Sequence, residues 1–354
     1  MIRFYCQCGT EIFFENSHCA VCGKVLGFDP KRQNLLALQA HEDNIWFSVT
    51  TSRRYRLCSL RQDLGCNWLI PVQQSDSQCL SCHLTRTIPT LTLQRNHTRW
   101  QSLEQTKRRA LYTILRLGLA FNSSTNSSSC SVTTPLPPLI FDFLEDQQSN
   151  SEVGLDFVYS GHSNGVITIN AAEADDSFRA ANRELMNEIY RTLLGHFRHE
   201  LGHYYGLLLK NDDRTFNEYQ QLFGDENQDY KAALEHYYAE GARDDWRESF
   251  ISAYASAHPQ EDWAETWAHY LHISDTLETA QAYQVMSCNP VGFAFERELS
   301  EWANLSVILN ALNRSMGVDD AYPFVITPII GQKLNFIDRL VKAWQVNGHN
   351  AARQ

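Results

Sequence analysis

Eight of the ten cysteines lie before residue 83, and this clustering constrains the N-terminal part of the chain more than any other feature. Closely spaced cysteines converge on one tetrahedral zinc ion, and free buried thiols do not account for so many cysteines in so short a segment. A structural zinc also supplies folding free energy, which a short cysteine-rich segment needs. The spacing divides these cysteines into two sets of four, namely Cys6, Cys8, Cys19 and Cys22, and then Cys58, Cys66, Cys79 and Cys82.

Each of the two sets ends in a CxxC pair, which is the stronger half of the zinc motif. The first half of each set is less regular in its spacing. Gly9 and Gly23 follow cysteines of the first set and relax the turns that bring the thiolates together. His83 stands next to Cys82 and could replace a thiolate, although we favour the cysteine. We therefore expect a tandem zinc ribbon over residues 1–95 that binds two structural zinc ions.

The N-terminal residues MIRFYCQCG contain neither an apolar stretch nor a small-residue cleavage site, so we expect no signal peptide. No run of about 18 apolar residues occurs in the sequence, which disfavours a membrane span. Cytoplasm is the default compartment for such a chain, and there CxxC pairs indicate metal sites rather than disulfides. The net charge of −11 disfavours sequence-independent binding to nucleic-acid phosphates. The two cysteines outside the sets, Cys130 and Cys288, are structural or incidental.

A polar segment divides the remainder of the chain. Asn122–Pro138 reads NSSTNSSSCSVTTPLPP, and this Ser/Thr/Asn-rich composition ending in prolines predicts a flexible or extended connection. Before it, Arg99–Phe121 has apolar residues at helical spacing and predicts one amphipathic helix. We assign residues 96–138 to a helix and linker, and residues 139–354 to a second domain.

The second domain begins with two short apolar runs and continues with helical patterns. Leu155–Ser160 and Gly165–Asn170 predict a β-hairpin or a pair of neighbouring strands. Asp175 and Asp176 provide N-cap chemistry for a long helix to about Leu209. The fold expected for the whole chain is therefore α+β, with a mainly helical second domain that carries a small β-sheet. Further helices are predicted near Glu226–Glu240, Asp245–Ala257, Glu261–His272, Glu298–Ser315 and Pro328–Val346, the last of them capped by Thr327.

The motif HELGH lies within one of these helical segments and carries the strongest chemical signal. His199 and His203 are four residues apart, so on a helix their imidazoles lie on one face and can reach one zinc ion. Glu200 is about 100° further around the helix, beside the metal rather than on it. From there it can take a proton from the attacking water and deliver it to the leaving amine.

A catalytic zinc needs a third protein ligand, and the downstream segment QEDWAETWAH offers candidates. Glu261, Glu265 and His269 follow one another at four-residue steps. No histidine stands six residues after HELGH, as the metzincin pattern would require, so a carboxylate on a second helix is favoured. One of the two glutamates should bind zinc and the other should accept a hydrogen bond from a ligand imidazole. Chemistry alone does not decide which is which.

The segments GHFRHELGHYYG and PQEDWAETWAHYLHISDTLETA together resemble the family of zinc-binding metallopeptidases that carry an N-terminal zinc ribbon. The resemblance covers nearly the whole chain. EDWAE is also similar to the ExxAE element of Pro-Pro endopeptidases and anthrax lethal factor. That resemblance implies that Glu261 is the zinc ligand and that Glu265 supports a histidine. It also implies that Tyr254, seven positions before Glu261, faces the reaction centre and donates to the oxyanion.

The expected activity is zinc-dependent hydrolysis of peptide bonds in a peptide or protein, in a gluzincin-like domain. One catalytic zinc would be held by His199, His203 and Glu261, in addition to the two structural ions of the ribbons. Glu200 would act as general base and then as acid, and Tyr254 would stabilise the oxyanion. We expect His196 and His269 to be structural. Arg198 and Tyr204 flank the motif and could contact substrate.

Two alternatives differ in what the metal and the ribbons do. A DNA-associated protease of the SprT type also joins HExxH to a zinc ribbon, and the net charge counts against it. A binding or scaffold protein would use the HExxH zinc structurally, with a closed fourth coordination position. The ribbons could contact protein or nucleic acid through a basic face built from Arg53, Arg54, Arg56, Arg86, Arg95 and Arg99.

Overall fold

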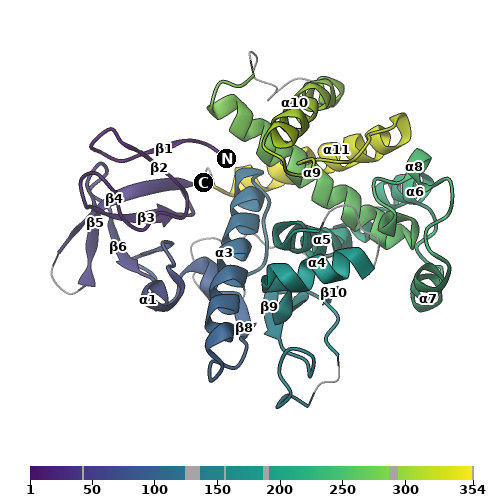
Figure 1. Cartoon of the computed structure of the whole chain (residues 1–354). Coiled ribbons are helices and arrows are strands. Elements are labelled where there is room, and N and C mark those ends of the chain that lie inside the picture. The colour runs from purple at the N-terminus through teal and green to yellow at the C-terminus, as the bar shows by residue number, and fades with distance from the viewer. Residues whose placement is uncertain (42–43, 124–135, 155–156, 186–190, 287–293, 353–354) are drawn as a thin grey trace. The chain divides into compact units, whose positions relative to one another are not determined.

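The computed structural model describes residues 1–41, 44–123, 136–154, 157–185, 191–286 and 294–352. The predicted fold class is confirmed, with a cysteine-rich ribbon region at the N-terminus followed by a mainly helical part and a small sheet (Figure 1). Internal contacts group the chain into two units. The first comprises Met1–Arg179 and Asn347–Gln354, and the second comprises Ala180–Val346.

A five-stranded antiparallel sheet in the order β3-β4-β5-β6-β7 forms the body of the ribbon region. Its apolar side chains pack into a core that includes Leu36, Leu38, Tyr55 and Leu69. A separate two-stranded antiparallel sheet, formed by β1 and β2, precedes it in the sequence. The elements are β1 Phe4–Tyr5, β2 Glu11–Ile12, β3 Val25–Asp29, β4 Asn34–Ala40, β5 Trp46–Ser48, β6 Arg54–Leu57, α1 Arg61–Leu64, β7 Leu69–Pro71 and α2 Leu80–His83.

The long helix α3 spans Gln94–Arg116, so the predicted helix exists but begins and ends earlier than Arg99–Phe121. Its end is set by Gly118, which has a φ of 67° and lies in the left-handed region. The Leu119 N–H donates to the Ile114 carbonyl at 3.1 Å, and the Gly118 N–H donates to Leu115 at 3.0 Å. This pair of bonds is a Schellman motif, which satisfies the last carbonyls and stops the helix.

A second sheet combines parallel and antiparallel pairs in the order β10-β11-β9-β8. A hairpin is present and its second strand agrees with the prediction, but the predicted first strand is wrong. The first strand is Gly161–Ser163, which was expected to be the connection, and residues 157–160 form no strand. Asn164 and Gly165 have φ values of 44° and 90°, as a two-residue type I′ turn requires, and this turn fixes the register. The other members are β8 Thr85–Thr87, β9 Ile140–Leu144 and β11 Val166–Asn170, followed by the 3-10 turn η2 Ala171–Ala174.

Residues 124–135 of the predicted linker lie outside the described residues, and so do Cys130 and Cys288. The two ends of the linker come together, because Asn122 forms an isolated parallel bridge with Pro138. The Leu139 N–H donates to the Asn122 carbonyl at 2.8 Å. The chain therefore enters β9 from a point next to the end of the α3 segment.

The long helix predicted from Asp175 to Leu209 is wrong, because the structure has two helices there. They are α4 Asp176–Leu185 and α5 Leu193–Gly206. Thr192 is extended, with φ −122° and ψ 150°, and its hydroxyl accepts from the Gly195 N–H at 3.0 Å. Thr192 is thus a new N-cap that starts the motif helix independently.

The remaining elements are helical, as expected, although their bounds differ, and α9 continues to Ala282 rather than ending near His272. The predicted helix Asp245–Ala257 consists of two separate turns, and the helix after Asp212 was not anticipated, although Asp212 caps it. Thr327 caps the last helix, since its hydroxyl accepts from the Ile330 N–H at 3.3 Å. The elements are η3 Leu207–Asn211, α6 Asp213–Phe223, α7 Tyr230–Glu240, α8 Trp246–Ser249, η4 Tyr254–Ser256, α9 Pro259–Ala282, α10 Phe295–Ser315 and α11 Pro328–Ala352.

Helices α5 and α9 pack closely against each other at the centre of the second unit (Figure 1). A Cβ at Gly202 would lie 2.9 Å from the Ala264 Cα, so the small residues at this crossing allow the two backbones to approach. The Trp263 indole N–H donates to the Gly202 carbonyl at 2.8 Å and fixes the crossing. No helix of the described residues is long and apolar enough to cross a bilayer.

Candidate metal centres

The structure brings each predicted set of four cysteines together. In the first set, Sγ of Cys6 lies 3.6 Å from Sγ of Cys22, and Cys8 lies 3.7 Å from Cys19. In the second set, Cys66 lies 3.6 Å from both Cys79 and Cys82. Disulfide sulfurs would be about 2.05 Å apart, whereas four thiolates about 2.3 Å from a tetrahedral zinc are about 3.8 Å apart. The donor set and the spacing fit zinc in both clusters.

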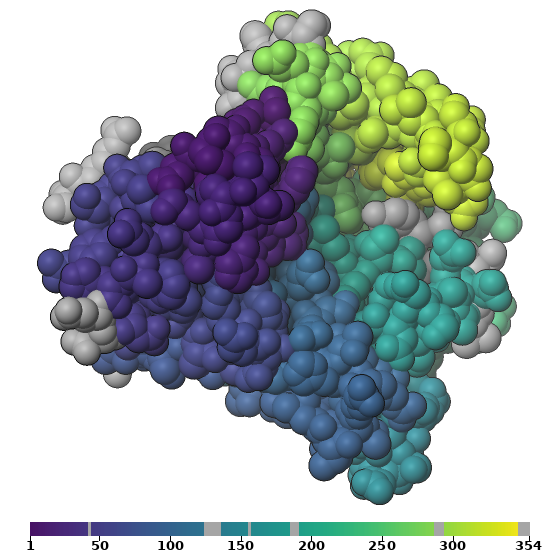
Figure 2. All heavy atoms as spheres, turned by 60° about the vertical axis from the view of Figure 1, so that its left-hand side comes forward, coloured from purple at the N-terminus to yellow at the C-terminus, as the bar shows by residue number. Residues whose placement is uncertain are grey.

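The two clusters differ in burial. Cys8 and Cys22 of the first cluster are exposed, and Figure 2 shows the residues of this ribbon, in deep purple, at the surface. All four cysteines of the second cluster are buried. Arg108 lies near them, and although burial opposes its charge, the attraction of the Cys66 thiolate and of other acidic groups raises its pKa. A tetrathiolate zinc site carries negative charge, which a buried arginine partly balances.

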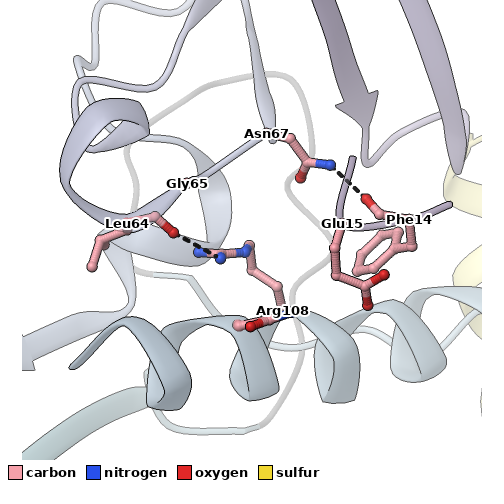
Figure 3. Close-up of a pocket in the computed structure, with 7 residues that line it drawn as sticks. Phe14, Glu15, Leu64, Gly65, Asn67 and Arg108 are labelled. Carbon is pink, nitrogen blue, oxygen red and sulfur yellow. Dashed lines mark hydrogen bonds between the residues drawn. The ribbon is translucent and has the colours of Figure 1, made fainter. Parts of the chain in front are cut away.

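Arg108 also crosses a small pocket between α3 and the ribbon, shown in Figure 3. Its guanidinium donates to the Leu64 carbonyl at 3.3 Å, and the Asn67 amide donates to the Phe14 carbonyl. No histidine or cysteine lines this pocket, so we assign it no metal. Its lining is Phe14, Glu15, Leu64, Gly65, Asn67, Gln105 and Arg108.

The third candidate centre joins the HELGH helix α5 to the start of α9. His199, His203 and Glu261 each offer a ligand atom, and these atoms lie within 4.8 Å of one another. The Nε2 atoms of the two histidines are 3.1 Å apart. The Glu261 carboxylate lies 3.1 Å from His199 Nε2 and 3.4 Å from His203 Nε2. One point in space is thus within reach of two imidazoles and one carboxylate.

Three further side chains hold the candidate ligands in place, one of them through another residue. Glu265 faces the opposite nitrogen of His199, with its carboxylate 2.7 Å from Nδ1. The Ser252 hydroxyl donates to the other oxygen of Glu265 at 2.6 Å. The Tyr230 hydroxyl donates to Glu261 Oε1 at 2.6 Å. Ser252 and Tyr230 were not anticipated, because neither has a spacing to the motif that helical geometry would mark.

The charges of the site fit a cation. Burial opposes the charge of Glu261, but the imidazoles of His203 and His199 dominate and hold the pKa of its carboxyl well below the usual value. Burial likewise opposes the charge of His199, but Glu261 and Glu265 raise its pKa well above the usual value. Glu261 Oε2 has no hydrogen-bond partner among the described residues. A buried acid with an open oxygen, facing imidazole nitrogens, is a donor set that zinc prefers.

Glu200 and Tyr254, the two residues assigned to catalysis, lie near the same centre. Glu200 is 3 % exposed, and its Oε2 has no hydrogen-bond partner among the described residues. The Tyr254 ring is centred 6.0 Å from that of His199. Burial and the neighbouring Glu261 raise the pKa of Tyr254 well above its usual value, so its hydroxyl stays protonated and can donate.

Other residues singled out in the sequence serve the packing around the site. Arg198 is buried and donates to Asp275 at 2.7 Å, and Tyr204 is fully buried, so neither faces solvent. His269 is buried against the Tyr322 hydroxyl at 2.8 Å. Five of the six arginines of the expected basic face contact groups of the chain. Arg54 lies over the Phe47 ring. The other four bind polar groups, namely Arg56 with Gln74, Arg86 with Asp142, Arg95 with Ser149 and Arg99 with Asp175.

Comparison with known proteins gives two family matches. Residues 96–340 match a family described as "Putative zinc-binding metallo-peptidase", and residues 3–93 match a zinc-ribbon domain. Uncharacterized proteins of Mycobacterium tuberculosis and Mycobacterium bovis are each 38 % identical over 351 residues, which covers 96 % of this chain and 95 % of the relative. No solved structure matches the chain.

Proposed function

The chain belongs to the zinc-binding metallo-peptidase family with an N-terminal zinc ribbon, and from that premise we propose that it hydrolyses peptide bonds at a zinc ion held by His199, His203 and Glu261. The observation that carries the proposal is the convergence of two imidazoles from one helix and a buried carboxylate from a second. Next to it stands Glu200, a buried carboxylate with an open oxygen. Three protein ligands leave a coordination position for the reaction, as in catalytic zinc sites.

Zinc, when bound, supplies a Lewis acid that polarises the scissile carbonyl and lowers the pKa of water. Glu200 accepts the proton of the attacking water on Oε2 and then donates it to the nitrogen of the leaving amine. The Tyr254 hydroxyl donates a hydrogen bond to the oxyanion of the tetrahedral intermediate. Glu265 holds His199 through Nδ1, so that Nε2 keeps its lone pair for the metal.

The remaining proposals concern the structural zinc ions, the domain bounds and the compartment. We propose one structural zinc in each cluster, which gives three zinc ions per chain with the catalytic one. The ribbon module takes residues 1–95, the helix and linker 96–138, and the peptidase domain 139–354. Paired thiols that hold metal rather than disulfides fit a reducing compartment, and we propose the cytoplasm.

The test compares wild type with Glu200→Gln on a proteome-derived peptide library. Glu200→Gln should keep its zinc and lose the cleavage products, because the amide cannot carry the proton from water to the amine. Glu235→Gln is a matched control, since Glu235 is an exposed residue of α7 that forms an ion pair with the exposed Lys231. Identical product profiles for wild type and Glu200→Gln would contradict the proposal and favour a scaffold with a structural zinc.

A further inference from the structure

Tyr230 contacts the candidate zinc ligand Glu261 from a different part of the chain. It is the first residue of α7, directly after the N-cap Asp229. Its hydroxyl donates to Glu261 Oε1 at 2.6 Å across 31 positions of sequence. Glu261 is 1 % exposed, so bulk water has little access to that oxygen to replace the bond.

This bond makes the two oxygens of Glu261 unequal. Oε1 accepts from Tyr230, whereas Oε2 has no hydrogen-bond partner among the described residues. Oε2 is also the oxygen closer to an imidazole, at 3.1 Å from His199 Nε2 against 3.4 Å between Oε1 and His203 Nε2. A carboxylate that could bind a metal through one oxygen or through both is thereby biased toward binding through Oε2 alone.

The ring of Tyr230 is itself held at the N-terminus of α9. It packs edge-on against His258, with ring centroids 5.1 Å apart. His258 is the N-cap of α9 and stands three residues before Glu261. Its Nε2 also lies 3.3 Å from the Gln228 carbonyl, which belongs to the segment that leads into α7. The hydroxyl therefore approaches Glu261 along a direction that two contacts define.

Helix α7 lies at the surface, and its Tyr237 ring also packs against that of Tyr254, with centroids 5.6 Å apart. None of its described side chains is buried, and Tyr230 itself is 40 % exposed. Glycines with positive φ bound the segment, Gly224 at 108° and Gly241 at 82°. Because burial contributes so little to holding this helix, the polar contact with Glu261 does not follow from core packing. It is the kind of contact that supports a metal ligand.

We propose that Tyr230 is a positioning residue for Glu261, whose hydroxyl holds Oε1 so that the carboxylate presents Oε2 alone to the metal. The proposal rests on the assignment of Glu261 as a zinc ligand under the proposed function. It is independent of whether the site hydrolyses peptides, because it concerns how the ligand is held.

The test is zinc binding by Tyr230→Phe, which removes the hydroxyl and keeps the ring against His258. Competition with a chelator should show weaker binding of one zinc, by about 10–100-fold, the usual effect of removing a group that supports a metal ligand. Zinc in the two cysteine clusters should be unchanged, because both clusters belong to the first unit and Tyr230 to the second. An unchanged far-ultraviolet circular dichroism spectrum should show that the helices of the second unit are folded. Tyr159→Phe is the control, because Tyr159 is 79 % exposed and belongs to the first unit of the chain.

The visible absorption of bound Co²⁺ gives a second readout, which a general loss of stability would not change. After a chelator removes only the metal of the His–Glu site, Co²⁺ added to the full chain reports the coordination number through its visible absorption. Tyr230→Phe should absorb more weakly than wild type, because Glu261 can then bind through both oxygens and the coordination number rises. Wild-type affinity together with a wild-type cobalt spectrum in Tyr230→Phe would overturn the proposal. A selective loss of zinc affinity with no peptidase activity in wild type would instead support it and contradict the proposed function.

Discussion

The two acids of the EDWAE segment differ in which nitrogen of His199 they face. Glu261 lies near Nε2, the nitrogen that also faces His203, whereas Glu265 lies near Nδ1 on the far side of the ring. A zinc ion binds the shared side of two imidazoles, and a carboxylate on the other nitrogen fixes the tautomer and the ring orientation. The geometry therefore favours Glu261 as the ligand and Glu265 as its support, in the order that the family resemblance implies.

A metal count on wild type, Glu261→Ala and Glu265→Ala checks this order. Wild type should carry close to three zinc ions per chain, one in each candidate centre. Glu261→Ala should lose one of them, because two imidazoles alone bind zinc weakly. Glu265→Ala should retain it with an affinity reduced by about 10–100-fold. Retention of all the zinc in Glu261→Ala, together with a loss in Glu265→Ala, would reverse the assignment.

Tyr254 can be tested apart from metal binding. Tyr254→Phe should keep the full zinc content, because Tyr254 is not one of the three proposed ligands. Its kcat should fall by about 10²–10³, the usual effect of removing one oxyanion donor, with little change in KM. Tyr237→Phe is a suitable control, since the ring of Tyr237 packs against that of Tyr254 at 5.6 Å. An unchanged kcat in Tyr254→Phe would assign its ring to packing alone.

His269 predicts a pH dependence of stability. Burial lowers its pKa from 6.5 to about 4, so the folded protein keeps this imidazole neutral where the unfolded chain is protonated. Stability from this group is complete above pH 6.5 and is lost as the pH falls toward 4, by about 3 kcal/mol in total. Urea unfolding at pH 7 and pH 5 should show a smaller loss in His269→Gln than in wild type. His236 is exposed, so His236→Gln should lose as much stability between pH 7 and pH 5 as wild type does.

At the scale of elements, the glycine of HELGH has a packing role at the α5–α9 crossing. A Cβ at Gly202 would meet the Ala264 Cα at 2.9 Å and the Trp267 Cβ at 3.1 Å, so a methyl group must push the helices apart. Gly202→Ala should lower the free energy of unfolding by about 1–3 kcal/mol, as measured by tryptophan fluorescence in denaturant. The motif helix therefore needs the small residue for its position as well as the histidines for the metal.

Gly331→Ala in α11 is the matched control for that substitution. Its Cβ would meet nothing closer than the Leu299 Cδ1 at 3.6 Å, an ordinary contact. Replacing a helical glycine by alanine should then be neutral or stabilise the protein by up to about 1 kcal/mol. Equal effects at Gly202 and Gly331 would mean that the helix crossing can relax.

The elements also show what the sequence could and could not predict. Periodicity and cap residues located most helices, and the four-residue steps of α5 and α9 identified the candidate ligands. The break before α5 was missed, because the helical pattern of apolar residues continues through it and only the capping hydroxyl of Thr192 marks the new start. The first strand of the hairpin was misplaced, because the positive φ of Asn164 and Gly165 fixes the turn and not the apolar run before it. Tyr230 and Ser252 reach the site through tertiary contacts, which leave no periodic signal.

At the scale of the whole molecule, the two cysteine clusters should contribute unequally to stability. Cys66 is 0 % exposed, in a cluster whose neighbours Trp68 and Leu69 are core residues, whereas Cys22 is exposed. A structural zinc supplies folding free energy, and more of the fold depends on it when the site lies within a core. The same substitution at Cys66 and at Cys22 should therefore destabilise the fold to different extents.

Cys66→Ser and Cys22→Ser should each lower the zinc content of the full chain, because each removes one of four thiolates. Cys66→Ser should lower the Tm much further, since without the buried zinc the ribbon core loses its cross-link and Arg108 loses negative charge that raises its pKa. Cys22→Ser should disturb mainly the exposed turns of the first cluster. Calorimetry with zinc analysis on both variants checks this order of Tm. An equal or larger fall in Tm for Cys22→Ser would mean that the first ribbon, despite its exposed thiols, stabilises as much of the molecule as the second.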